Sequence, residues 1–176
     1  MDRITSDTLE VFFQNLGKRI EGRVSFYLVG GSALLLLGSP RETIDVDYVI
    51  EPSSTEVEGL IKQLSNEMQL DLEPVPLDEF VPLPAEAGAR HRLIGHYGQI
   101  DVYVFDPYSI ALSKLDRGFD TDIDDILFLL HRAIITLPIL EQVVRDALPR
   151  LRDFDMNSGD LIKHLQAVQD ALQGHP

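Results

Sequence analysis

The 176-residue chain contains no cysteine, so disulfides and thiolate metal sites are excluded. It also lacks any apolar run of about 18 residues, and no membrane-spanning segment is expected. The first residues, MDRITSDTLE, lack the basic stretch and apolar core of a secretory signal. We therefore expect a cytoplasmic protein that makes no membrane contact.

Basic residues are scarce, with 15 Lys and Arg against 29 Asp and Glu and a net charge of -14. Such a charge repels nucleic-acid phosphates at long range, although a local basic patch could still hold an RNA end. Arg90, His91 and Arg92 form the one local cluster of cations, and a solvated strand face is the alternative interpretation of it. The acidic surface equally favours solubility.

Several well-known catalytic signatures are missing. The five histidines form no H-E-x-x-H pair, and no serine lies in a G-x-S-x-G turn. The chain has no G-x-x-x-x-G-K-[ST] loop either. A zinc protease, a serine hydrolase of the nucleophile-elbow type and a P-loop NTPase are therefore not expected.

Apolar residues make up 44% of the chain, which is enough for one domain with a substantial core. Their spacing predicts mixed helices and strands up to residue 106 and only helices afterwards. We therefore expect an α/β (α+β) core at 1–106 and a helical C-terminal subdomain of the same domain at 107–176. Four prolines make 70–84 an irregular or edge segment. The expected helices are about 7–20, 32–37, 54–68, 107–115, 121–132, 138–148 and 158–173, and the expected strands are 25–29, 43–50, 90–97 and 99–105.

Two carboxylates, Asp45 and Asp47, are two residues apart in a strand-like segment and so point to the same face. A turn of Gly30, Gly31 and Ser32 precedes them, where a backbone can approach phosphates closely. Carboxylates suit Mg²⁺ or Mn²⁺, and Asp101 in a later apolar strand is the best third ligand. The alternative is that all three side chains lie at solvated strand ends.

The Gly-Gly-Ser turn, the Asp-x-Asp pair and the later Asp101 resemble the signature of the polymerase β-type nucleotidyltransferase superfamily. The chain is most similar to small bacterial nucleotidyltransferase-fold proteins related to abortive-infection toxins. Thr43, the segment Lys114-Leu115-Asp116-Arg117 and the following Asp122-Ile123-Asp124-Asp125 also resemble that group. The resemblance covers about 26–130 and implies a small mixed sheet flanked by helices.

The resemblance also implies roles for individual residues. Backbone N–H groups at Gly30, Gly31 and Ser32 would hold the phosphates of a nucleoside triphosphate. Asp45, Asp47 and Asp101 would bind the metal ions, and Asp101 would bind the metal that activates the acceptor or act as its base. Lys114, and less strongly Arg117, would contact the triphosphate. Asp122 and Asp125 would serve as helix N-terminal residues, complete the site or pair with Lys114.

The function that follows is metal-dependent transfer of a nucleoside monophosphate from an NTP to an acceptor hydroxyl on an RNA end or a protein. The likeness extends to toxins of toxin–antitoxin pairs, which would add an antitoxin partner. One alternative is a non-catalytic nucleotide-binding or protein-interaction module that keeps the fold. The other is a small-molecule adenylyltransferase of the antibiotic-resistance type, since an acidic surface suits a cationic substrate.

Overall fold

The computed structural model of the chain describes residues 3–174 and divides into two compact units. The first, here called the sheet unit, comprises 1–75 and 91–105. The second, here called the helical unit, comprises 76–90 and 106–176. The division at 105/106 lies one residue from the boundary expected from the sequence, but the helical unit also includes 76–90.

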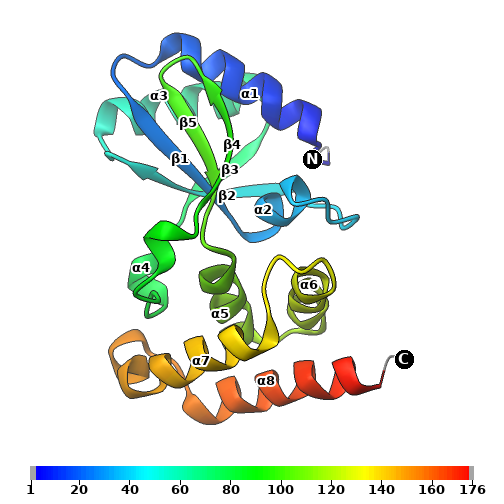
Figure 1. Cartoon of the computed structure of the whole chain (residues 1–176). Coiled ribbons are helices and arrows are strands. Elements are labelled where there is room, and N and C mark those ends of the chain that lie inside the picture. Colours follow the sequence, from blue (N-terminus) through cyan, green and yellow to red (C-terminus); the bar gives the residue numbers. More distant parts are fainter. Residues whose placement is uncertain (1–2, 175–176) are drawn as a thin grey trace. The chain divides into compact units, whose positions relative to one another are not determined.

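The sheet unit is built on five strands in the order β3-β2-β1-β5-β4. The central strand β1 pairs antiparallel with β2 and parallel with β5, while the edge strands β3 and β4 pair with β2 and β5 respectively. This mixed sheet with flanking helices confirms the expected fold class (Figure 1). The elements are α1 Ser6–Arg19, β1 Val24–Val29, α2 Gly30–Leu36, β2 Asp45–Glu51, α3 Thr55–Met68, β3 Asp71–Pro74, β4 Arg92–Tyr97 and β5 Ile100–Val104.

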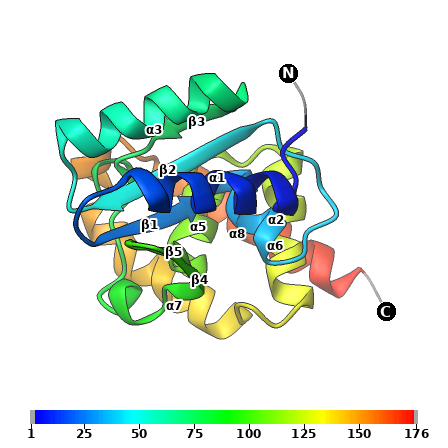
Figure 2. The ribbon, with the colours of Figure 1, turned by 90° about the horizontal axis from the view of Figure 1, so that it is seen from above.

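One face of the sheet, here called the helix face, forms the core of this unit. Helices α1 and α3 lie along it (Figure 2), and Phe12 and Phe13 of α1 meet Phe26 of β1 edge to face. Phe26 also stacks on Tyr48 of β2, with ring centroids 4.9 Å apart. Side chains alternate along a strand, so the neighbours of Phe26 on β1 and of Tyr48 on β2 point to the opposite face of the sheet. We call this opposite face the carboxylate face.

The helical unit contains α4 Leu77–Phe80, η1 Ala87–Ala89, α5 Pro107–Arg117, α6 Asp120–His131, α7 Leu137–Ala147, η2 Leu148–Phe154 and α8 Ser158–Gln173. A buried ion pair ties 76–90 to the helices, since Arg90 donates to both carboxylate oxygens of Asp106 at 2.9 and 3.0 Å. The Arg90 guanidinium also lies 4.6 Å from the centre of the Tyr108 ring. Arg90 is therefore part of the packing of this unit and not of an exposed basic patch.

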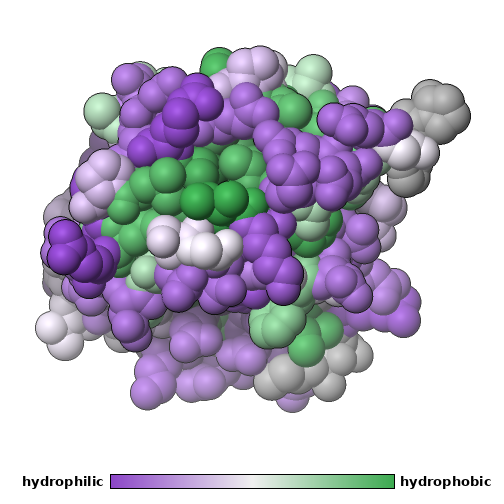
Figure 3. Space-filling view, turned by 90° about the horizontal axis from the view of Figure 1, so that it is seen from below, coloured by the Kyte–Doolittle hydropathy of each residue, from purple (hydrophilic) through white to green (hydrophobic). Residues whose placement is uncertain are grey.

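The surface of the helical unit includes apolar side chains. Ile139 on α7 is 46% exposed and Ile162 on α8 is 52% exposed. The molecule seen from below shows an apolar area bordered by hydrophilic residues (Figure 3). None of the helices formed within residues 3–174 is both long and apolar enough to cross a membrane.

The close packing of Gly17 of α1 against the backbone of Tyr97 generates a stability prediction. A Cβ at Gly17 of α1 would lie 2.0 Å from the carbonyl oxygen of Tyr97, whereas a Cβ at Gly59 of α3 would meet nothing within 4 Å. We expect Gly17→Ala to lower the free energy of unfolding by about 3 kcal/mol through overpacking. Gly59→Ala, the matched control, should raise it by roughly 0.5–1 kcal/mol because alanine favours helix. Urea unfolding of both variants measures this, and equal effects at the two glycines would contradict the packing argument.

Candidate functional site

The site begins where β1 ends and α2 starts. Gly30 adopts a left-handed backbone with φ of +63°, and a Cβ there would lie 2.5 Å from Oδ2 of Asp47. The antiparallel register sets Asp47 opposite Val29, the residue before this turn. The half-buried carboxylate of Asp47 therefore packs in the space that a side chain at residue 30 would fill.

The second glycine has the same relation to Thr43. A Cβ at Gly31 would lie 2.8 Å from the Thr43 hydroxyl oxygen, and that hydroxyl is 3.1 Å from Oδ1 of Asp45. It also lies 3.2 Å from the Asp45 carbonyl oxygen. A hydroxyl donates a single hydrogen, and the two oxygens of Asp45 near Thr43 compete for it. Through the contact with Oδ1, Thr43 helps to orient the exposed Asp45 side chain. The Gly-Gly pair thus admits the two groups that position the Asp-x-Asp motif.

Ser32 follows in the first turn of α2 and is fully buried. Its hydroxyl donates to the carbonyl oxygen of Val29 at 3.1 Å, so this hydroxyl supports the turn. No side chain caps the start of α2. The first N–H groups of a helix have no intrahelical acceptor. That of the half-buried Gly31 is therefore available to a ligand, whereas that of Ser32 lies in a fully buried residue.

Asp101 also points to the carboxylate face, but the register does not bring it to Asp45 and Asp47. It lies opposite Ser25 near the beginning of β1, whereas Asp47 lies opposite Val29 at its end. Four residues of strand correspond to about 13 Å. Our expectation of a third metal ligand at this position is therefore not met by the sheet geometry.

The side chain of Asp101 is held by Arg23 and His96 at its own end of the sheet. Arg23 donates to both carboxylate oxygens at 2.9 and 3.0 Å, and His96 Nδ1 lies 2.6 Å from Oδ1. Hydrogen bonds from Arg23 first, and from His96 second, lower the pKa of Asp101. The arrangement is that of a largely buried carboxylate paired with a more exposed arginine.

The register brings a different carboxylate to the acidic pair. Glu73 on the edge strand β3 lies opposite Asp47, so both project from the same face. The sequence analysis missed it because 70–84 was read as irregular or edge, with no register to β2. Like charges placed opposite each other are destabilising, and a cation would offset this. Within residues 3–174, however, no three acidic or histidine side chains converge into a ready-made metal site.

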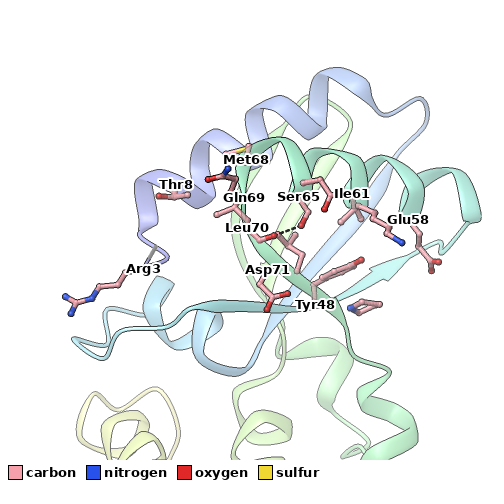
Figure 4. Close-up of a pocket in the computed structure, with 14 residues that line it drawn as sticks. Arg3, Thr8, Tyr48, Glu58, Ile61, Ser65, Met68, Gln69, Leu70 and Asp71 are labelled. Carbon is pink, nitrogen blue, oxygen red and sulfur yellow. Dashed lines mark hydrogen bonds between the residues drawn. The ribbon is translucent and has the colours of Figure 1, made fainter. Parts of the chain in front are cut away.

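A pocket of about 1050 Å³ opens on the other side of β2. Tyr48 points into it, together with Ile61, Ser65 and Glu58 of α3 (Figure 4). Burial raises the pKa of Tyr48 to about 12. None of the predicted site residues lines this pocket, so it is separate from the Asp45–Asp47 site.

Comparison with known proteins supports the fold and identifies the family of the chain. The family model for nucleotidyltransferases of unknown function (DUF6036) matches residues 8–163. The chain belongs to this nucleotidyltransferase family. The fold is similar to the crystal structure of an antigenic nucleotidyltransferase-like protein from Paracoccidioides brasiliensis, with a TM-score of 0.50 and 19% identity over 91% of this chain and 94% of that one. None of the curated proteins matches the chain.

The two predicted triphosphate contacts of this nucleotidyltransferase-family chain lie in the helical unit, where both are ion-paired. Lys114 is 3% exposed, and its Nζ lies 2.7 Å from Asp125 and 3.5 Å from Asp122. Arg117 donates to Asp122 at 2.5 Å and keeps a side chain that is 55% exposed. These pairs join α5 to α6 across the turn at Gly118. Of the alternatives considered for Asp122 and Asp125, the structure contains the pairing of both with Lys114. It also contains the helix N-terminal role for Asp122, which accepts from the Phe119 N–H at 3.3 Å in the first turn of α6.

The buried lysine gives a second stability prediction. We expect Lys114→Met to lower the free energy of unfolding by about 3 kcal/mol or more, because it leaves buried carboxylates without their cation. Lys163→Met, on an exposed position of α8, is the control and should change stability by less than about 0.5 kcal/mol. Urea unfolding followed by circular dichroism compares them. Unchanged stability in Lys114→Met would refute a structural role for this lysine.

The Asp101 cluster predicts a pH effect. Because the folded pKa of Asp101 is lowered, its contribution to stability is full above the unfolded value of about 3.9 and is lost as pH falls through the folded pKa. We expect Arg23→Gln to raise the pKa of Asp101 toward its ordinary value, so that acid unfolding starts at higher pH. An NMR titration of the carboxyl carbons measures the pKa of Asp101. Arg152→Gln is the control, and it should leave the pKa of Asp101 unchanged. An unshifted Asp101 titration in Arg23→Gln would exclude this ion pair in solution.

Proposed function

We propose that the chain is a metal-dependent nucleotidyltransferase whose reaction centre is the Asp45–Asp47 pair beside the Gly30–Gly31 turn. A hydroxyl oxygen of the acceptor forms a bond to the α-phosphorus of an NTP. The bond from that phosphorus to the bridging oxygen breaks, pyrophosphate leaves, and the hydroxyl proton passes to water. Family membership supports the reaction class, and the packing of Asp47 and Thr43 against two glycines is the observation that supports this location.

The donor set fits a hard divalent cation. Mg²⁺ or Mn²⁺ takes oxygen ligands, and Mg²⁺ is commonly held by one or two carboxylates together with substrate phosphates. Asp45 and Asp47 supply the carboxylates, and Thr43 fixes one of them. When bound, the metal would neutralise charge on the triphosphate. The phosphates themselves would be held by the backbone N–H group of Gly31, because Ser32 is fully buried and supports the turn through its hydroxyl.

Of the two cations proposed as triphosphate contacts, Arg117 is the better candidate because its side chain is partly exposed. The buried Lys114 is better explained by its pairing with Asp125. We propose an RNA end or a protein hydroxyl as the acceptor. The sequence resemblance to abortive-infection toxins supports a narrower proposal, that of a bacterial cytoplasmic toxin with an antitoxin partner.

One observation favours a second candidate, a nucleotide-binding module without turnover. The position of Asp101 leaves two of the three expected carboxylates at the site. Such a module would still bind a metal–nucleotide complex but would transfer nothing. Binding with and without transfer therefore separates the two candidates.

The test uses α-labelled ATP, CTP, GTP and UTP with Mg²⁺ or Mn²⁺, and offers cell RNA, cell protein and an aminoglycoside as acceptors. We expect the chain to label one acceptor class, and Asp45→Asn and Asp47→Asn each to lower the rate by about 100-fold or more, since each removes a group that stabilises transition-state charge. Asp101→Asn is the matched control on the same face and should retain most of the rate.

The outcomes are separable. Labelling of the aminoglycoside alone would support the small-molecule alternative, and NTP binding without labelling would support the non-catalytic module. Loss of transfer in Asp101→Asn, with transfer kept in Asp45→Asn, would place the reaction centre elsewhere.

A further inference from the structure

The carboxylate face carries a cluster of aromatic rings that the proposed reaction does not use. One of them, Phe105, is buried, and the other three are half-buried. Tyr27 of β1 and Tyr103 of β5 lie opposite each other in the register, and their rings stack with centroids 5.1 Å apart and an angle of 22°. His91 lies 4.7 Å from the Tyr27 ring and 4.4 Å from Phe105. We call Tyr27, His91, Tyr103 and Phe105 the aromatic cluster.

The cluster is separate from the core of the sheet unit. Phe26, on the other face of β1, packs with the rings of α1 and with Tyr48. Tyr27 and Tyr103 point to the opposite face and are only half-buried. Leu93, which pairs with Tyr103 on the edge strand, is 50% exposed. The cluster is thus a partly accessible aromatic surface on the face that also carries the acidic pair.

The register fixes how far this surface is from the reaction centre. Asp47 of β2 lies opposite Val29 of β1. Tyr27 is two residues before Val29 on β1, and its side chain is therefore on the same face as Asp47. Two residues of strand span about 7 Å. A nucleotide whose phosphates lie at Asp47 and the Gly30–Gly31 turn could therefore place its ribose and base over this surface.

The other end of the surface is polar. The pKa of Tyr27 is raised mainly by partial burial, while a hydrogen bond with Ser25 acts in the opposite direction. Asp101 is two residues before Tyr103 on β5 and lies on the same face, and Arg23 and His96 both contact its carboxylate. A base stacked on the aromatic cluster would therefore meet hydrogen-bonding groups at one edge and the acidic pair beyond the other.

We propose that the aromatic cluster is a stacking surface for a nucleobase, with Tyr27 and Tyr103 as its binding residues. This inference rests on the proposed nucleotide site at Asp45 and Asp47 and adds to it a site for the base. Stacking tolerates any base because each has a flat π-face, so affinity for all four bases is expected. The base would come from the NTP or from the 3′ end of an RNA acceptor.

The experiment measures binding without requiring turnover. The chain has five tyrosines and no tryptophan, so its tyrosine emission is not masked and includes that of Tyr27 and Tyr103. The ligands are ATP with Mg²⁺, inorganic tripolyphosphate with Mg²⁺, and the triadenylate ApApA without a triphosphate. The variants are Tyr27→Leu, Tyr103→Leu and the corresponding Phe substitutions. Tyr97→Leu is the control, because the Tyr97 ring packs near Phe13 of α1.

We expect each Leu variant to weaken ATP binding about ten-fold, as the loss of one stacking contact predicts. Tripolyphosphate should bind the Leu variants as it binds wild type, which also shows that the site remains folded. The Phe variants should keep the wild-type affinity while losing part of the emission quenched by ATP. A loss restricted to ApApA would identify the RNA end as the source of the base.

Other results overturn the proposal. If the Leu variants bind ATP and ApApA as wild type does, the aromatic cluster is not a base site, while the proposed nucleotide site stands. If wild type binds ATP no more tightly than tripolyphosphate and does not bind ApApA, the base makes no contact and the inference also fails. If wild type binds none of the three ligands, the proposed nucleotide site fails together with it.

Discussion

The absence of Cβ atoms at residues 30 and 31 is the constraint on which the candidate site depends. Strand β2 returns antiparallel beside β1, and its first residues reach the turn that ends β1. Asp47 and Thr43 then occupy the two spaces where side chains at 30 and 31 would lie. Thr43 in turn positions Asp45. The placement of the two carboxylates therefore depends on both the backbone conformation at the two glycines and the register of β1 with β2.

Side chains alternate between the two faces of the sheet along three neighbouring strands, so the residues of the core and those of the candidate site lie on opposite faces. On the helix face, β1, β2 and β5 contribute buried side chains that pack beneath α1 and α3. On the other face the same strands carry Asp45, Asp47, the two stacked tyrosines and Asp101. Because the core side is apolar apart from the Tyr48 hydroxyl, the second face can hold charges and half-exposed rings that would be costly in a core.

Local patterns predicted the fold well because apolar alternation, glycine turns and caps are written in short stretches of sequence. The Gly30–Gly31 turn and most element positions followed from them. Three features depended on long-range register or packing instead. Asp101 could not be placed without knowing which residue of β1 it faces, and Glu73 could not be placed without the β2–β3 pairing. The third is the place of 76–90 in the helical unit, where Arg90 pairs with Asp106, a residue 16 positions later in the chain.

The distribution of cations bears on how an acidic chain could bind a triphosphate. It has 15 Lys and Arg against 29 Asp and Glu, and Lys114, Arg90, Arg117 and Arg23 are each held by a carboxylate. Arginine and lysine in such pairs offer less charge to a ligand than solvated ones. Neutralising three phosphates would then fall to a divalent metal on Asp45 and Asp47 and to backbone N–H groups at the start of α2. The charge balance therefore favours metal-dependent binding at this turn over binding by a basic patch.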